Sequence, residues 1–298
     1  MSEFRLPRFR KLDGPTLAVT AALYGGWLGA TAWHAAIPTP ILFLLGGWLL
    51  AWHGSLQHET IHGHPTGNVV VDRAIGFVPL SLWLPYSVYR RSHLAHHGCG
   101  AITDPRRDPE SRYHDRRRGF AWAFGRLHAS LVGQLLLGPP ISIVRFLANE
   151  TARFRYQPRQ VARDWAPHLI AVAGLLWWLD HVGLSIARYA LTFLYPGTML
   201  TMLRSFAEHN AGLATSARAV SVERGGPLAL LYLNNNLHAA HHERPMLAWY
   251  ELPAYHHAHR QRFAREGAVS YASYSEVARR FAFRAHDDML HPAHREPA

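Results

Sequence analysis

Histidine is the residue type through which this sequence could do chemistry. The chain has 22 histidines among 298 residues. Two groups repeat the pattern HxxHH, and one shorter group has the pattern HxxxH: His93, His96 and His97; His238, His241 and His242; His58 and His62. On a helix, residues i, i+3 and i+4 lie near one face, so each group is expected to offer its imidazoles to one centre. Because histidine is the commonest metal ligand, the spacing predicts a metal site.

The ligand type is compatible with iron. At this chain's histidine frequency, HxxHH should arise about 0.1 times by chance, yet it occurs twice. Neutral imidazole suits iron among the first-row metals, whereas soluble di-iron bundles use carboxylates with two GluxxHis motifs. Only one such motif is present here, from Glu59 to His62. The single cysteine, Cys99, excludes an internal disulfide and a cysteine-held cluster.

Four apolar stretches are expected to position the histidine groups. Residues 15–37 and 41–56 form one predicted membrane hairpin, and residues 166–186 and 189–203 form a second. The basic N-terminus places the outer ends of the first hairpin in the cytoplasm by the positive-inside rule. All three histidine groups then lie on the cytoplasmic side.

The remaining segments are predicted to lie at the membrane surface or beyond it. Residues 69–88 carry charges and prolines, which indicates an interfacial or re-entrant segment. Residues 127–147 are expected to be broken at their centre by Pro139 and Pro140 and to lie on the cytoplasmic leaflet. A loop is predicted over 211–227 and a helix carrying the third histidine group over 228–249.

The predicted fold is therefore all-α. It is a polytopic membrane protein with four transmembrane helices in two hairpins, interfacial helices and a cytoplasmic histidine-rich cap. It forms one domain over 1–298, with a basic N-terminus at 1–14 and a polar tail at 254–298. The net charge of +11 comes from basic residues that flank apolar stretches, so an anionic membrane is expected as partner and nucleic acid is not.

The order of these motifs resembles the membrane-bound fatty-acid desaturase superfamily, which includes related hydroxylases and carotenoid ketolases. The resemblance runs from about residue 15 to residue 253. It implies that the eight clustered histidines ligate two irons, and that His209, in the motif SFAEHN, is a ninth ligand. It also implies O2 as co-substrate, a lipid acyl chain as substrate, an external electron donor and a bacterial inner membrane location.

Other side chains are expected to support this site. Carboxylates usually orient ligating imidazoles, and Glu59, Asp104 and Glu208 are close enough in sequence to do so, with His64 nearby. Asp108 and Glu243 are instead interpreted as surface charges. Four aromatic residues near the histidine groups could line a substrate tunnel or lie at the membrane interface: Trp52, Trp83, Tyr86 and Trp249.

Alternatives remain open. Residues 58–62 also read HExxH, the motif of zinc proteases, but the aspartate available as third ligand, Asp180, lies at the outer end of its stretch. A metal transporter would need ionisable residues inside its spans. Desaturation is favoured over hydroxylation or ketolation, although TDPRRDPE, HHERP and WYELP also resemble the carotenoid ketolases. A ferredoxin-type donor is expected to dock on basic residues: Arg106, Arg107, Arg116, Arg117 and Arg118.

Overall fold

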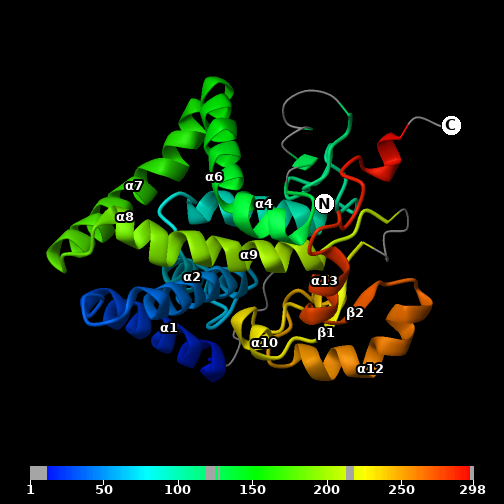
Figure 1. Ribbon diagram of the computed structural model, residues 1–298, viewed down its shortest axis with the longest axis horizontal. Helices are drawn as coiled ribbons and strands as arrows, with labels where there is room; N and C mark the ends of the chain where they lie inside the picture. Colours follow the sequence, from blue (N-terminus) through cyan, green and yellow to red (C-terminus); the bar gives the residue numbers. More distant parts are fainter. Residues whose placement is uncertain (1–11, 118–121, 123–124, 127, 213–217, 296–298) are drawn as a thin grey trace. The chain divides into compact units, whose positions relative to one another are not determined.

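The computed structural model describes residues 12–117, 122, 125–126, 128–212 and 218–295. Helices dominate this part of the chain, and one two-stranded sheet accompanies them (Figure 1). The chain divides into two compact units. The first unit comprises Met1–Arg90 and Arg145–Thr198, and the second comprises Arg91–Val144 and Met199–Ala298. Their sequence boundaries fall within helices α4, α6 and α9.

Among its described residues, the first unit has helices as its regular secondary structure, joined by turns and short loops. Its complete elements are α1 (Gly14–Ala32), α2 (Thr39–Ile61), α3 (Val69–Phe77), α7 (Pro158–His181), α8 (Ile186–Tyr189) and the π-helix η1 (Ala190–Leu194). It also holds the start of α4 (Tyr86–Gly98), the end of α6 (Leu131–Tyr156) and the start of α9 (Tyr195–Glu208). Asp13 caps α1, because its carboxylate accepts a hydrogen bond from the Thr16 N–H at 3.1 Å.

Glycines on α2 allow η1 and α9 to approach closely. A Cβ atom at Gly46 would collide with the Thr192 carbonyl, and one at Gly47 would lie 2.7 Å from Cβ of Pro196. This contact fixes the helix whose last turns carry His58 and His62. The core of the unit consists of buried leucines and aromatic residues, among them Leu42 and Phe193.

The membrane topology differs in part from the prediction. Among the described residues, α2 and α6 are long and apolar enough to cross a membrane. The helices over 158–181 and 186–208 meet this criterion only as a pair, bent by 105°. Apolar side chains such as Leu44 and Ile170 remain exposed at 71% and 75%, as lipid contact would require. The structure therefore has two or three candidate spans, and the four predicted spans are not confirmed.

The predicted interruption of residues 127–147 is wrong for α6, which runs unbroken through Pro139 and Pro140. A proline removes one N–H donor from a helix, and long apolar helices tolerate this loss where the freed groups find other partners.

The second unit combines short helices with a small sheet. Its complete elements are β1 (Ser221–Arg224), α10 (Pro227–Leu231), α11 (His238–Glu243), α12 (Leu252–Arg265), β2 (Ser270–Ser273), α13 (Tyr274–Phe281) and the 3-10 helix η3 (Pro292–His294). Strands β1 and β2 are parallel, with Ser221 opposite Ser270 and Arg224 opposite Ser273.

Two predictions fail in this unit. Strand β1 lies within the predicted loop at 211–227, and the predicted helix over 228–249 is divided into α10 and α11. Leu233 and Asn234 between these helices have φ values of 49° and 55°, which interrupt a right-handed helix. Asn236 then bonds the carbonyl of Val222 at 2.7 Å, so polar contacts to β1 replace helical ones.

Candidate metal centre

Four histidines of the second unit converge on one point. His96 comes from α4, His209 directly follows α9, and His238 and His242 come from α11. Their ring nitrogens all lie within 4.8 Å of one another. The Nε2 atom of His242 lies 3.2 Å from that of His96, 3.3 Å from that of His209 and 3.0 Å from that of His238. We call this set the four-histidine cluster.

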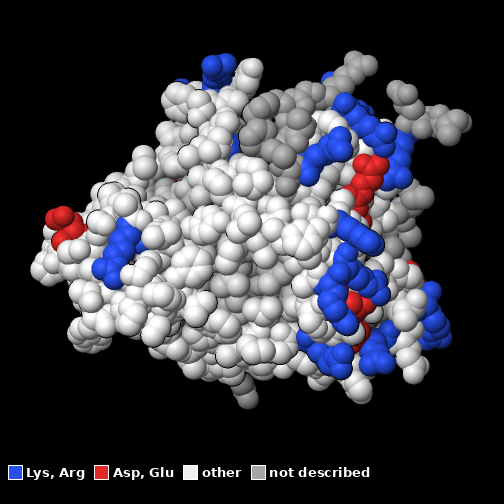
Figure 2. Space-filling model, in the orientation of Figure 1, with Lys and Arg blue, Asp and Glu red and all other residues white. Residues whose placement is uncertain are grey.

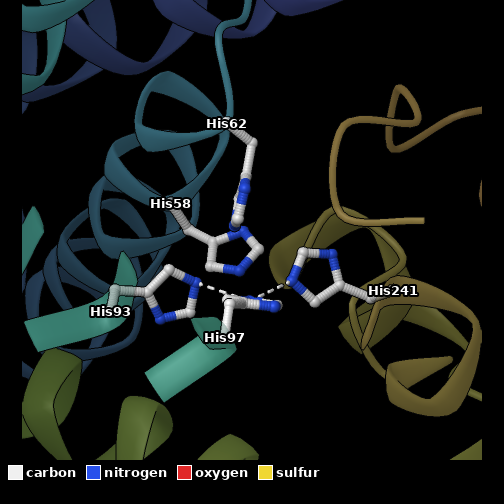
Figure 3. A group of neighbouring side chains, drawn as sticks. All are labelled: His58, His62, His93, His97 and His241. Atoms are coloured by element: carbon white, nitrogen blue, oxygen red, sulfur yellow. Dashed lines mark hydrogen bonds between the residues drawn. The ribbon is translucent and has the colours of Figure 1, made fainter. Parts of the chain in front are cut away.

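A second set of imidazoles meets nearby in the same unit. His97 on α4 places its Nε2 atom 3.2 Å from that of His93 and 3.1 Å from that of His241 (Figure 3). We call these residues the three-histidine cluster. In the first unit, His58 and His62 project from the end of α2 with ring centroids 4.8 Å apart (Figure 3).

Each HxxHH motif therefore divides its ligands between two clusters. His93 and His97 belong to one cluster and His96 to the other, and α11 divides its histidines in the same way. The expectation that each motif serves one centre is therefore wrong, and the geometry of a helix explains why. At about 100° per residue, positions i+3 and i+4 lie on opposite sides of position i and point about 100° apart.

Burial favours the neutral form of four of these imidazoles. Desolvation lowers the pKa of His97 to about 2, and the neighbouring histidines reinforce the effect. Burial likewise holds the pKa values of His209, His238 and His242 well below the ordinary histidine value. A neutral imidazole keeps a lone pair, which is the form that binds a metal.

Two carboxylates orient rings in these clusters. The Nδ1 of His96 contacts both oxygens of buried Asp108 at 2.9 Å, and Nδ1 of His93 contacts Glu110 at 3.2 Å. Burial opposes protonation of His96, but the Asp108 hydrogen bond and the nearby carboxylates outweigh it and raise the His96 pKa. An Nδ1–H that donates to a carboxylate leaves the Nε2 lone pair facing the cluster.

The structure corrects the interpretation of Asp108 as a surface charge, because its side chain is only 1% exposed. The sequence reasoning did not consider Glu110. Both residues follow the second histidine group within the segment TDPRRDPE, and this proximity was the available signal. Glu243 does behave as a surface charge, since it pairs with Arg262 at 2.6 Å and is about one-third exposed.

The other predicted supporting residues have varied surroundings. Glu59 contacts Nδ1 of His58 at 3.3 Å, within the first unit. Glu208 lies 3.7 Å from Nδ1 of His238, which contacts the Asn235 side chain at 3.2 Å. His64 pairs with Asp13 at 2.7 Å, and Asp104 pairs with His294 at 2.8 Å.

The four predicted tunnel aromatics are divided between the units. Trp52, Trp83 and Tyr86 belong to the first unit and Trp249 to the second. Tyr86 is buried and its hydroxyl contacts that of Thr60 at 2.9 Å. The indole N–H groups of Trp52 and Trp83 are buried and find no hydrogen-bond acceptor within the described part of the chain.

The four-histidine cluster fits a transition metal. Nitrogens about 2.0–2.1 Å from one cation lie about 3.0 Å apart at octahedral corners and about 3.4 Å apart at tetrahedral corners. The Nε2 separations of 3.0–3.3 Å span this interval. Converging ring nitrogens, with Asp108 on the outer nitrogen of His96 and Asn235 on that of His238, together make a metal-binding arrangement.

Comparison with known protein families agrees with this chemistry. The family model described as Fatty acid desaturase matches residues 31–275, which include the seven histidines of the two clusters and both histidines of the HxxxH motif. No curated protein matches the chain. A match of this extent, joined to the histidine clusters and the apolar helices, shows a membrane oxidoreductase, and the chain belongs to the fatty acid desaturase family.

Proposed function

We propose that this protein is an O2-dependent di-iron desaturase that introduces a double bond into the acyl chain of a membrane lipid. The convergence of seven imidazoles in two clusters, in a chain of the fatty acid desaturase family, is the observation that carries the proposal. A desaturase must remove hydrogen from unactivated carbon, and metal-bound O2 chemistry is the means that such a ligand set would support.

The ligand assignment is part of this proposal. His96, His209, His238 and His242 would hold one iron, and the three-histidine cluster would hold the other. The sequence order and the family match support the addition of His58 and His62 to the second iron. Together the two irons would supply O2 activation when bound.

The protein's own groups prepare these ligands. Asp108 and Glu110 accept the Nδ1 protons of His96 and His93, which fixes the tautomer that exposes Nε2. Burial lowers the pKa values of His97 and His209, which favours the neutral form that keeps a lone pair for a metal. Trp52, Trp83, Tyr86 and Trp249 are proposed to line the channel for the acyl chain, and Glu59 and Glu208 are proposed to orient His58 and His238.

A hydroxylase or carotenoid ketolase is the second candidate. The motifs TDPRRDPE, HHERP and WYELP favour it, as do the indole donors of Trp52 and Trp83. A buried donor without an acceptor is costly, and an oxygen on a substrate could satisfy it.

Electrons are proposed to come from a ferredoxin-type donor at the cytoplasmic face of a bacterial inner membrane. Exposed Arg106, Arg116 and Arg117 line a hollow of about 710 Å³ together with Arg295. Figure 2 shows that basic side chains gather over the second unit. Positive charge of this kind attracts an acidic partner. Arg107 is also exposed and directly follows Arg106 in the chain. Arg118 lies outside the described residues.

Lipid mass spectrometry tests the reaction. The protein is expressed in a host with a defined lipid pool, and the lipids are compared with those of a host expressing the His241→Ala variant. Loss of two hydrogens from an acyl chain supports desaturation, whereas gain of one oxygen would replace it with the second candidate.

Metal analysis tests the centre independently. Purified protein should hold about two irons per chain, and the His96→Ala and His241→Ala variants should hold less iron and lack activity. One zinc and no iron would overturn the proposal and favour the protease reading of residues 58–62. Full activity in either variant would contradict the ligand assignment.

A further inference from the structure

A segment close after the second histidine group carries both carboxylates of the centre. Residues 102–114 include Asp108 and Glu110, which contact His96 and His93. A second segment, residues 286–294, packs along it within the same unit. This C-terminal segment lies beyond the residues that match the family model, which end at 275.

Thr103 is the strained point of residues 102–114. Its φ is 75°, a left-handed conformation that a β-branched residue rarely adopts. In this conformation the Thr103 N–H donates to Oδ2 of Asp108 at 2.7 Å. The same carboxylate contacts Nδ1 of His96, so the backbone of Thr103 helps to hold the group that orients a proposed ligand.

Three contacts hold Thr103 in place. Its N–H is bound by Asp108, its carbonyl accepts from the Ser111 hydroxyl, and its own hydroxyl contacts Nε2 of His291 at 3.1 Å. The Nδ1 of His291 accepts from the N–H of Ala293 at 3.2 Å. The His291 proton is therefore on Nε2, and His291 donates to Thr103. His291 is fully buried, so water does not compete for this bond.

Further contacts fix the C-terminal segment against residues 102–114. The backbone N–H of His114 donates to the Met289 carbonyl at 2.8 Å, and that of His291 donates to the His114 carbonyl at 3.0 Å. Asp287 accepts from Arg112 at 2.9 Å and from the Tyr113 hydroxyl. His291 is thus held at a defined position from both sides of its contact with Thr103.

We propose that His291 is a positioning residue for the metal centre. It holds Thr103 in its left-handed conformation, Thr103 directs its N–H to Asp108, and Asp108 fixes the ring of His96. Without His291, Thr103 relaxes toward an ordinary conformation and the carboxylate loses one of its donors. This inference rests on the proposed function, because the importance of the His96 orientation depends on a bound metal.

The test measures how fast iron leaves the purified protein when a chelator is added. His291→Ala should raise the release rate about tenfold, within the range known for residues that support metal ligands. Glycine adopts a positive φ without strain. The double variant Thr103→Gly/His291→Ala should therefore release iron within about threefold of the wild-type rate.

His256→Ala is the matched control. His256 is also buried in the second unit and contacts a carboxylate, Glu223, at 3.1 Å. Within the described part of the chain, its hydrogen bonds and ring contacts involve Glu223 and Phe263 and none of residues 102–114. Equal iron release from His256→Ala and His291→Ala would overturn the inference, as would failure of Thr103→Gly to restore retention. A wild-type protein that holds no iron would instead overturn the proposed function.

Discussion

Asp108 illustrates how one side chain can prepare a metal ligand. Both of its oxygens lie 2.9 Å from Nδ1 of His96, and the N–H groups of Thr103 and Glu110 donate to the same carboxylate. Burial alone would raise the pKa of Asp108, but these hydrogen bonds lower it, led by the bond to His96. Asp108 is thus ionised at neutral pH, which makes it a strong acceptor for the His96 proton.

Replacement of Asp108 by asparagine should weaken metal binding. The amide is nearly isosteric but uncharged, and only its oxygen can accept a hydrogen bond. We expect a loss of 10–100-fold in iron affinity or in turnover, which iron titration and product formation would measure.

Glu243→Gln provides the control for this substitution. Glu243 pairs with Arg262 at the surface, and surface pairs contribute about 0–1 kcal/mol. A loss of iron affinity from Glu243→Gln as large as that from Asp108→Asn would show a general effect of carboxylate removal.

Asp287 should make the stability of the metal-free protein depend on pH. Burial raises the Asp287 pKa, but hydrogen bonds from His286 and Tyr113 and the charge of Arg112 outweigh it, and the pKa is lowered. The stabilisation is therefore complete above the unfolded pKa of about 3.9 and is lost as pH falls through the folded value.

Asp287→Asn tests this dependence. The variant should lose about 2 kcal/mol of unfolding free energy at pH 7, because it leaves buried donors poorly paired. The difference from wild type should shrink as pH falls below about 4. Denaturant unfolding of metal-free protein in detergent measures both quantities, and a difference that stays constant down to pH 3 would contradict the role assigned to the ionised carboxylate.

At the scale of elements, the contact of α2 with η1 and α9 positions the HxxxH motif. Gly47 packs on Pro196, and a Cβ atom on Gly197 would collide with the side chain of Leu50. Both helices have glycine where they meet, which allows their backbones to approach closely. The close contact leaves little room for α2 to shift along its axis, so the position of His58 and His62 within the first unit depends on it.

A larger residue at Gly47 should therefore destabilise the first unit. Gly47→Val would overpack the contact with Pro196 and should cost about 1–3 kcal/mol, which thermal unfolding in detergent would show as a lower midpoint. Gly25→Ala is the control, because Gly25 is exposed on α1 and no atom lies near the new Cβ. Alanine has the higher helix propensity, so the stability of this variant should be equal to that of wild type or slightly higher. Equal destabilisation by both changes would contradict the packing argument.

The histidine spacing predicted which imidazoles come together in the second unit better than the sequence predicted the arrangement of the elements. The apolar run around residue 50 identified α2, because composition and length alone define such a helix. Pro139 and Pro140 gave a wrong prediction of a break. The low helix propensity of proline does not show whether a long apolar helix continues through it, as α6 does. The late start of α11 depends on the hydrogen bond from the Asn236 side chain to β1, which is distant in sequence. The burial of Asp108 depends on the turn of the chain that brings the Thr103 N–H to its carboxylate. Neither contact has a periodic signature.

At the scale of the whole molecule, the basic surface of the second unit is the proposed docking site of the electron donor. Arg106, Arg116 and Arg117 have side chains 60–73% exposed, and their pairs with Asp115 and Asp288 leave an excess of positive charge. Charge of this kind acts mainly on the rate of encounter. Its influence should therefore weaken as salt screens it.

Reversal of these three charges to glutamate should slow donor-dependent turnover. We expect a decrease of about tenfold at low ionic strength and a much smaller one at high salt, with turnover driven by a small chemical reductant unchanged. Steady-state rates against donor concentration would measure it.

Arg260, Arg265 and Arg279 allow a control with the same change in net charge, because all three are exposed on α12 or α13 and none of them lines the hollow. If their reversal slowed donor-dependent turnover equally, net charge rather than a docking site would explain the result.

Neighbouring residues serve different clusters at two places in the chain. His96 and His97 are joined by one peptide bond, as are His241 and His242, yet each pair is divided between the four-histidine and three-histidine clusters. A cation bound to one cluster therefore orders the two backbone segments that also carry ligands of the other cluster. Binding of the second cation then costs less conformational entropy. Loading should consequently be cooperative, so that limiting iron yields a mixture of empty and doubly loaded molecules with few half-filled ones. A cell short of iron would then keep fewer active molecules instead of many inactive halves.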